Sequence, residues 1–345
     1  MNLQPIIPTL VFKAFNLPVD SVFKPIGSGH IHQTFSIDGA ERFVLQRVNK
    51  NIFTKPEVIA TNNRLAANYL ATKFPDYLFS TTIPTQSGEE MVYDSEGFPW
   101  RLYSLIENTQ TIDFVTSEAE AYEAAKGFAK LSRKLDGIDC RLFKPTLDRF
   151  HDLAWRYEQF ETELARASDA VKASVQSEIR AAIKFHYLVD EYNQLVKSGS
   201  LKERITHNDT KINNILFDSE TKKAVCVIDL DTLMPGYFIY DLGDLVRTCV
   251  SPVSEEEKDV TKIEFRKTIY DALLRGYLSE MEQTMTEEEL QAVPFAGKMM
   301  TYIMALRFLA DFLRGNTYYH ITYPEQNKVR ARNQLYLLNI LTEKV

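Results

Sequence analysis

The sequence is poor in cysteine and has no long apolar stretch, and each shortage argues against a class of protein. Its three cysteines, Cys140, Cys226 and Cys249, show no Cys-X-X-Cys spacing, so neither a disulfide framework nor a zinc site is expected. We expect them to be buried thiols. No apolar run approaches the roughly 20 residues of a membrane-spanning helix, so no membrane association is expected.

Basic residues are also in the minority. There are 40 lysines and arginines against 47 aspartates and glutamates, which leaves a net charge of −7. Binding nucleic acid requires a basic surface that displaces phosphate counterions, so this class is not expected, whereas one nucleotide needs only local charge. The N-terminal stretch MNLQPIIPTLVFKAF lacks the features of a secretory signal, so we expect a cytoplasmic protein. No segment indicates an obligate protein partner.

The pattern changes about one third of the way along the chain. A chain of 345 residues is longer than one compact core usually grows, so we expect two lobes around a cleft. Short β-prone runs with one helix give way to long helical patterns between Glu107 and Asp113. This predicts an α+β fold, with an N-terminal lobe over residues 1–107 and a larger, mainly helical lobe over residues 108–345.

The N-terminal lobe is predicted to contain an antiparallel sheet. Two β-prone runs meet at Gly27, Ser28 and Gly29, and an alternating strand follows at residues 41–49. Apolar residues at helical spacing predict one helix over residues 55–72. Further strands are expected in TTIPT, EEMVYD and FPWRLYSLI.

Long helical patterns fill the C-terminal lobe. They cover residues 117–135, 147–166, 169–197, 255–282, 287–316 and 325–341, and another helix is expected near Tyr240. A hairpin at residues 213–230 is the only predicted interruption.

This hairpin carries polar residues at one end. Two apolar, β-prone runs flank the turn-like DSETKK. Pairing about the middle of this turn brings Asn214, at the start of the first strand, to Asp229, at the end of the second. Asp209, five residues before Asn214, can reach the same point through a short loop. Three oxygen-bearing side chains are therefore predicted to converge.

Such a cluster suits phosphoryl transfer. Carboxylate and amide oxygens are the ligands that Mg²⁺ prefers, and a separate carboxylate is needed to orient the attacking hydroxyl. The spacing of His207, Asp209 and Asn214, followed by Asp229, matches the catalytic loop and metal-binding aspartate of protein kinases. The alternative is an ordinary hairpin whose aspartate and asparagine residues only form turns.

On these residues the sequence resembles the aminoglycoside phosphotransferase and choline kinase-like family of small-molecule kinases. Within that family, THNDTKINNILFD and VIDLDTLMPGYFIYDLGDLVR are similar to bacterial N-acetylhexosamine 1-kinases. The resemblance implies a protein kinase-like fold, a need for ATP and Mg²⁺, and a sugar 1-phosphate product. It also implies that Asp209 is the catalytic base and that Asn214 and Asp229 are metal ligands. Asp231 is a candidate auxiliary ligand.

The residues expected to hold the phosphates lie in the N-terminal lobe. In the turn at Gly27, Ser28 and Gly29, backbone amides can approach phosphates because the glycines have no side chain. The next strand should carry a lysine for the α- and β-phosphates, but it has Gln46 there, with Arg47 beside it. Side chains alternate along a strand, so only one of the two can face the cleft. We expect Gln46 to face inward.

Two further segments carry predictions, one about the adenine and one about the acceptor. Backbone groups from Leu105 to Glu107 are expected to bind adenine. Only about ten residues separate Asp229 from the helix expected at Tyr240, whereas a protein kinase needs a longer platform for its peptide and an A-P-E signature. A small-molecule acceptor is therefore predicted.

Two acidic residues near this helix have two interpretations. Asp241 and Asp244 fit a helix N-cap with an acid three residues later. Asp244 is also a candidate for the substrate site.

Arg307 likewise has two interpretations. It precedes Asp311 by one helical turn, which favours a surface ion pair. Alternatively, Arg307 reaches the cleft and binds the sugar, and Phe238, Tyr237 or Tyr318 offers a face for the sugar ring.

The combined prediction is in-line transfer of the γ-phosphoryl group of ATP to the anomeric hydroxyl of an N-acetylhexosamine, GlcNAc or GalNAc. Another acceptor, such as an aminoglycoside, choline, ethanolamine or homoserine, is the nearest alternative, and a cationic one would call for carboxylates near Asp209. A nucleotide-binding module without catalysis is disfavoured by the complete set of Asp209, Asn214 and Asp229.

Overall fold

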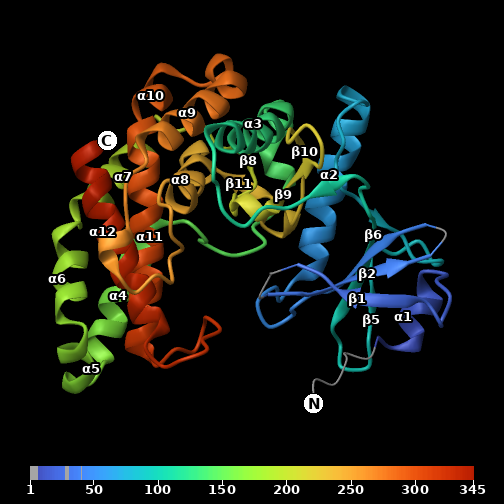
Figure 1. Ribbon diagram of the computed structural model, residues 1–345, viewed down its shortest axis with the longest axis horizontal. Helices are drawn as coiled ribbons and strands as arrows, with labels where there is room; N and C mark the ends of the chain where they lie inside the picture. Colours follow the sequence, from blue (N-terminus) through green and yellow to red (C-terminus); the bar gives the residue numbers. More distant parts are fainter. Residues whose placement is uncertain (1–6, 28–30, 40) are drawn as a thin grey trace.

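The computed structural model describes residues 7–27, 31–39 and 41–345. A sheet with α1 (Thr9–Ala14) against it lies beside a larger part built mainly of helices (Figure 1). The long helix α2 (Pro56–Lys73) lies between the sheet and that larger part in this view. The α+β class expected from the sequence is confirmed.

Within the described residues, six antiparallel strands form the N-terminal sheet. Their order is β1, β2, β3, β6 and β4, and β5 pairs with β6. The bounds are β1 Val22–Pro25, β2 Gln33–Asp38, β3 Phe43–Arg47, β4 Thr82–Ile83, β5 Val92–Tyr93 and β6 Pro99–Ser104.

The two faces of this sheet differ because side chains alternate along each strand. Leu45 and Leu102 pack with Phe12 of α1 in an apolar cluster that is separate from the main core. Gln46 and Arg101 lie on the opposite face, where Arg101 reaches the helical part of the molecule. The polar face of the sheet therefore faces the predicted cleft.

The larger part contains ten described helices and two small sheets. The helices are α3 Glu118–Leu135, α4 Leu153–Arg166, α5 Asp169–Ser174, α6 Gln176–Lys184, α7 Tyr187–Lys197, α8 Phe238–Cys249, α9 Lys267–Met281, α10 Glu287–Gln291, α11 Val293–Arg314 and α12 Gln326–Lys344. One sheet joins β7 (Thr109–Gln110), β9 (Ile215–Asp218) and β10 (Ala224–Val227), and the other joins β8 (Arg204–Thr206) to β11 (Met234–Gly236). The predicted lobe boundary at residue 107 falls between β6 and β7.

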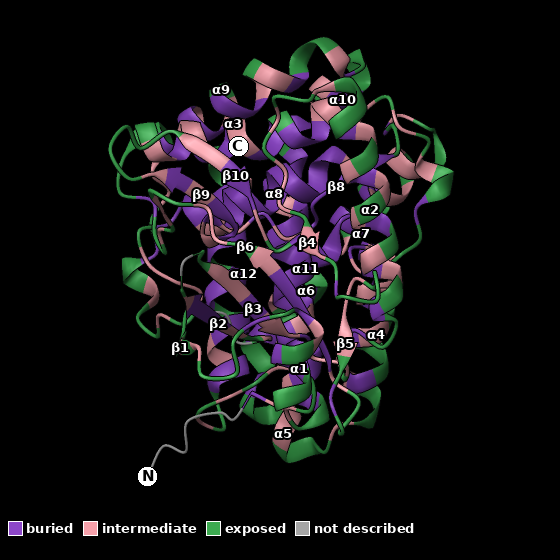
Figure 2. Cartoon of the chain, turned by 90° about the vertical axis from the view of Figure 1, so that its right-hand side faces the viewer, coloured by how far each residue is buried: buried purple, intermediate pink, exposed green. Residues whose placement is uncertain are grey.

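The core of this part is organised around α11. This helix is buried along most of its length and contacts α4, α8 and α12. Buried residues fill the interior of the molecule and exposed residues cover outer elements such as α1 and α5 (Figure 2). Among the described helices, none has the length and apolar character needed to cross a membrane.

Several predicted helices differ in extent from the observed ones because tertiary packing interrupts the local pattern. The helix predicted over residues 169–197 is divided into α5, α6 and α7, and the buried residues Val175 and Phe185 lie at the two breaks. The one predicted over 255–282 begins only at Lys267, because Glu255 is drawn into an ion pair with Arg247.

Two more helix boundaries were predicted wrongly. The helix predicted from residue 147 begins at Leu153, where the Asp152 side chain caps it. The single helix predicted over residues 287–316 is two, because α11 restarts with Pro294 in its first turn. The sequence prediction also missed α1, β7, β8 and β11. As expected, Cys226 and Cys249 are buried free thiols, whereas Cys140 is half-buried.

Candidate active site

The predicted hairpin is formed by β9 and β10. Ile215 pairs with Val227, and the register shifts nearer the turn. The Ile228 amide donates a hydrogen bond to the Asn214 carbonyl at 2.9 Å. The start of β9 therefore lies beside the end of β10, as the sequence predicted.

The loop that precedes β9 is held by buried hydrogen bonds. The carboxylate of Asp241, in α8, accepts bonds from the backbone amides of His207 and Asn208 at 3.0 and 2.7 Å. The His207 ring accepts a bond from the Asp209 amide at Nδ1 (3.2 Å), and its Nε2 lies 2.9 Å from the Ile228 carbonyl. The loop is thus fixed from both α8 and β10.

Asp241 does not have the predicted role of a helix N-cap. α8 begins at Phe238, after the N-cap residue Tyr237, so Asp241 lies inside the first turn and is free to hold the loop. Asp244, one turn later, forms a buried ion pair with Arg247 at 2.7 Å.

Asp209 lies in this loop with a cation beside it. Lys211 Nζ is 3.2 Å from Asp209 Oδ1, and Asn214 Nδ2 is 3.2 Å from Oδ2 and 2.8 Å from the Asp209 carbonyl. Burial acts to raise the pKa of Asp209, but the charge and hydrogen bond of Lys211, together with the smaller effects of His207 and Arg247, outweigh it, and the pKa lies below its usual value. Asp209 is therefore an ionised carboxylate that can orient a hydroxyl and accept its proton.

Asn214 and Asp229 are the residues predicted to hold a cation, and each has an oxygen that could bind one. Because the amide nitrogen of Asn214 bonds to Asp209, its oxygen is the atom that can bind a cation. Asp229 has φ and ψ of 58°, a left-handed conformation that is costly for this residue and often kept at functional sites. Its side chain has an exposed face. Enclosure by the surrounding chain and the negative charge of Asp231 raise the pKa of Asp229. A divalent cation with oxygen ligands fits this uncompensated charge.

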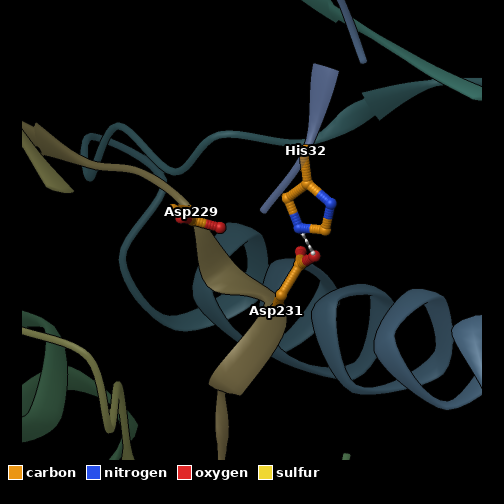
Figure 3. A group of neighbouring side chains, drawn as sticks. All are labelled: His32, Asp229 and Asp231. Atoms are coloured by element: carbon orange, nitrogen blue, oxygen red, sulfur yellow. Dashed lines mark ion pairs between the residues drawn. The ribbon is translucent and has the colours of Figure 1, made fainter. Parts of the chain in front are cut away.

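Asp231 lies only two residues further on but is already engaged by two side chains of the protein. Its Oδ2 is 2.8 Å from His32 Nε2 (Figure 3), and its Oδ1 is 2.6 Å from Arg101 Nη1. Burial alone would raise the pKa of Asp231, but Arg101 and His32 hold it well below its usual range. Asp229 is therefore left as the carboxylate that is open to a metal.

The predicted phosphate turn is only partly described. Gly27 has a φ of 82°, which glycine adopts without strain, whereas Ser28 and Gly29 lie outside the described residues. On β3, Gln46 lies on the face toward Asp231, the orientation expected from the sequence, and Arg47 points to the other face and pairs with Asp94 at 3.0 Å.

The connection after β6 is bound to the edge of β3. The Leu105 amide donates a hydrogen bond to the Arg42 carbonyl at 2.9 Å, and the Glu107 carboxylate lies 3.2 Å from the Arg42 guanidinium. Two of the groups in the segment expected to bind adenine are therefore already engaged.

A hollow of about 240 Å³ is lined by arginine and aromatic side chains, and one of its lining residues, Phe150, directly precedes His151, which contacts the Asp209 loop. The Arg307 guanidinium is 4.9 Å from the ring centroid of Phe150. Arg156 donates a hydrogen bond to the Phe150 carbonyl at 2.8 Å. Burial and the charge of Arg307 lower the pKa of Arg156 to about 9. Within the described residues neither guanidinium forms an ion pair with a carboxylate, and the acidic residues Asp148 and Asp311 also line the hollow.

Two sequence predictions about this region are wrong. Arg307 and Asp311 do not form the expected surface ion pair, because Asp311 accepts hydrogen bonds from the amides of residues 317–319 at 2.9 to 3.0 Å. Phe238 was expected to offer a ring face to the substrate, but it is 0% exposed because the first turn of α8 packs into the core.

Three residues of the site were missed. Lys211 could have been found from the sequence, because it lies only two residues after the predicted catalytic Asp209. Arg101 and His32 carry no local signal, because only the pairing of β3 with β6 and the approach of β2 to the hairpin bring them to Asp231.

His151 is a buried, neutral histidine that supports the same loop. Its Nε2 lies 2.7 Å from the Asn208 carbonyl, and burial lowers its pKa to about 3. The unfolded chain takes up a proton near pH 6.5, whereas the folded chain does not do so until far lower pH. The resulting stability is complete above pH 6.5 and is lost as the pH falls, by up to about 1.4 kcal/mol per pH unit.

We therefore expect His151→Gln to flatten the pH dependence of stability. Glutamine keeps a donor for the Asn208 carbonyl but does not titrate. Urea unfolding between pH 4 and 7 measures the free energy of unfolding, and exposed His320→Gln is the control. Equal slopes for the wild type and His151→Gln would contradict the assignment.

With this geometry in place, known proteins can be compared. The sequence profile of the phosphotransferase enzyme family matches residues 22–287, which is most of the chain. The chain belongs to this family.

Solved structures share the fold at low sequence identity. A microcompartment-associated aminopropanol kinase is 15% identical, with 97% of this chain and 95% of that chain covered and a TM-score of 0.63. An aminoglycoside phosphotransferase from Alicyclobacillus acidocaldarius is 14% identical (99% and 97% covered, TM-score 0.63). Amicoumacin kinase, solved with AMP-PNP, Ca²⁺ and its substrate, is 12% identical (97% and 94% covered, TM-score 0.62). At such identity the likeness shows the fold alone.

Proposed function

We propose that this protein is a kinase that transfers the γ-phosphoryl group of ATP to the anomeric hydroxyl of an N-acetylhexosamine. One observation carries the proposal: the ionised Asp209 carboxylate lies beside Lys211 and Asn214, at the end of the hairpin where we place the divalent cation. The solved amicoumacin kinase binds a nucleotide analogue and a divalent ion on the same fold, which supports ATP and a divalent metal here.

Each residue of the set has one task in this reaction. Asp209 orients the sugar hydroxyl and takes its proton, while the new O–P bond forms and the bond from the γ-phosphorus to the ADP oxygen breaks. Asn214 and Asp229 would hold Mg²⁺, which neutralises phosphate charge when bound. Lys211, 3.2 Å from Asp209, adds a positive charge beside the transferred group.

The nucleotide contacts follow the sequence expectations. We place the phosphates against the turn at Gly27, Ser28 and Gly29, and the adenine against backbone groups between Leu105 and Glu107. Both placements rest on the order of these segments along the sequence. We also expect the reaction to take place in the cytoplasm, where ATP is supplied and free thiols persist.

The guanidinium groups of Arg156 and Arg307, which line the hollow, favour a neutral acceptor over a cationic one. An amine brought to Arg156 and Arg307 would meet two positive charges in partly buried surroundings, where screening by water is weak. Hydroxyl groups and the carbonyl of an N-acetyl group instead accept hydrogen bonds from guanidinium groups. Tyr318 and Tyr319, which also line the hollow, offer ring faces for the sugar.

A panel of acceptors tests the proposal. We expect turnover with GlcNAc or GalNAc to exceed that with glucosamine, choline, ethanolamine and an aminoglycoside, and phosphorus NMR should place the phosphate on the anomeric oxygen. GlcNAc and glucosamine form the critical pair because they differ only by an acetyl group that removes the ammonium charge. A preference for glucosamine or choline would overturn the proposed acceptor. If homoserine is added to the panel and is the only compound phosphorylated, the protein is a homoserine kinase.

Arg307→Met should act on this acceptor site alone. We expect it to raise the KM for the sugar by roughly 10- to 100-fold, the effect of losing charge-assisted hydrogen bonds, and to leave the KM for ATP near that of the wild type. Arg332→Met is the matched control, because Arg332 pairs with Glu178 and is not among the residues that line the hollow. An unchanged KM for the sugar in Arg307→Met would remove Arg307 from the site.

A further inference from the structure

Gln46 occupies the position where a kinase strand usually carries its phosphate-binding lysine. In the antiparallel pair of β3 and β6, the residue directly opposite Gln46 is Arg101. Side chains of directly opposed residues leave the sheet on the same face. A cation therefore does emerge at this point of the sheet, but from the neighbouring strand.

Gln46 holds Arg101 in one orientation. Its side-chain oxygen accepts hydrogen bonds from Nε of Arg101, at 2.9 Å, and from Nη2. Its amide nitrogen donates to Thr34 Oγ1 on β2 at 3.1 Å. The remaining nitrogen, Nη1, reaches Asp231, and Arg101 is only 3% exposed. A lysine at position 46 would set a second cation against this guanidinium, whereas glutamine supplies the acceptor it needs.

A second group from the sheet region closes on Asp231 from another direction. His32 Nδ1 accepts a hydrogen bond from the Asn49 amide at 3.0 Å, so the hydrogen lies on Nε2, which faces Asp231 at 2.8 Å. Its ring stacks on Phe53 at 5.4 Å. The side chain of His32 and that of Asp231 point toward each other across the gap between β2 and the hairpin (Figure 3).

Both carboxylate oxygens of Asp231 are thus held by the N-terminal part of the chain, although Asp231 belongs to the hairpin of the helical part. Asp231 is 2% exposed. Removing one partner of a buried ion pair is strongly destabilising, because an uncompensated charge stays buried. Asp229, the open carboxylate of the cation site, is two residues away in the same short turn. Whatever fixes Asp231 also limits where Asp229 can lie.

We propose that Arg101, Asp231 and His32 form a clamp that joins the nucleotide lobe to the metal-binding turn, and that Gln46 is a positioning residue for Arg101. The clamp differs in task from a phosphate-binding lysine on β3: it fixes the turn of Asp229 relative to the sheet of the nucleotide lobe. Asp231 serves the clamp and is not a metal ligand. The inference rests on the proposed function, on its metal site for the Mn²⁺ readout and on its acceptor for the kinetic readout only.

Relocating the cation tests the clamp. We expect Arg101→Met to weaken Mn²⁺ binding to the protein–ADP complex, followed by electron paramagnetic resonance, by roughly 10- to 100-fold, the range seen when support of a metal ligand is lost. With GlcNAc, kcat should fall by roughly 100-fold, because a displaced reacting group costs that much. In the double variant Arg101→Met/Gln46→Lys, a lysine on β3 supplies a new cation that can reach Asp231. The Mn²⁺ affinity should then recover by at least roughly tenfold over that of Arg101→Met.

A buried ion pair elsewhere is the matched control. Arg204 and Glu289 lie 2.7 Å apart and are both buried, so Arg204→Met should lower the thermal midpoint as Arg101→Met does, with Mn²⁺ affinity unchanged below that midpoint. If Arg101→Met does not fold, Gln46→Met keeps both charges and should weaken Mn²⁺ binding in the same direction, by about tenfold.

Three results would overturn the clamp: wild-type Mn²⁺ affinity in folded Arg101→Met or in Gln46→Met, equal weakening in Arg204→Met, or no recovery in the double variant. Mn²⁺ and ADP binding need no acceptor. A failure of the sugar to react therefore contradicts the proposed function and leaves this test intact.

Discussion

Asp209→Asn is expected to lower kcat by roughly three to four orders of magnitude, the upper part of the range for a lost general base. The amide keeps the shape of the side chain and can still accept the bond from Asn214, but it cannot take the proton of the attacking hydroxyl. Nucleotide binding should change little, because the metal ligands Asn214 and Asp229 remain. Single-turnover transfer to GlcNAc and calorimetric titration of ADP with Mg²⁺ measure the two effects.

The same chemical change at an exposed position is the control for this variant. Asp190, on α7, is largely exposed, and Asp190→Asn should react like the wild type. Turnover of Asp209→Asn within tenfold of the wild type would remove Asp209 from the role of base. Loss of ADP binding alongside turnover would instead indicate a damaged loop.

Asp229→Asn is expected to separate activity from stability. The variant loses the open negative charge of the cation site, so kcat should fall by roughly 10³-fold and divalent ion binding should weaken. The free energy of unfolding at pH 7 should rise slightly, for two reasons. The repulsion between Asp229 and Asp231 that raises the pKa of Asp229 disappears, and asparagine tolerates the left-handed backbone at this position better than most residues do.

Urea unfolding in the absence of metal measures the stability, and Mn²⁺ titration measures the site. Asp218→Asn, at the far end of the same hairpin, is the control, because asparagine can still accept the hydrogen bonds that the Asp218 side chain takes from the turn. A destabilised Asp229→Asn that keeps its activity would show that this residue is structural.

The spacing of residues in the sequence was sufficient to predict which residues form the catalytic part of the site. A hairpin imposes its own register, so the distance in sequence between Asn214 and Asp229 determines that they meet. The loop from His207 to Asn214 is short enough to return Asp209 to the same end. These relations need no contact with the rest of the chain, and in the structure Asn214 contacts both Asp209 and Ile228, the residue before Asp229.

Contacts between distant segments decided the rest. Arg307 lies one turn before Asp311, and helical geometry alone favours their pairing. The segment after α11 folds back and takes the Asp311 carboxylate for its backbone amides. Arg307 is thereby left among aromatic rings. Phe238 likewise had a suitable side chain, but the packing of α8 against the core directs it inward.

The sequence by itself determined the α+β class, the change from strands to helices and the convergence of Asp209, Asn214 and Asp229, because these follow from periodicity and from short loops. Only the tertiary structure decided which side chains engage the neighbouring Asp231. Gln46 marks a missing lysine in the sequence, and nothing nearby replaces it. The pairing of β3 with β6 and the approach of the sheet to the hairpin bring Arg101 and His32 to Asp231. Such pairings depend on the sum of many weak contacts along the whole chain, which no local pattern contains.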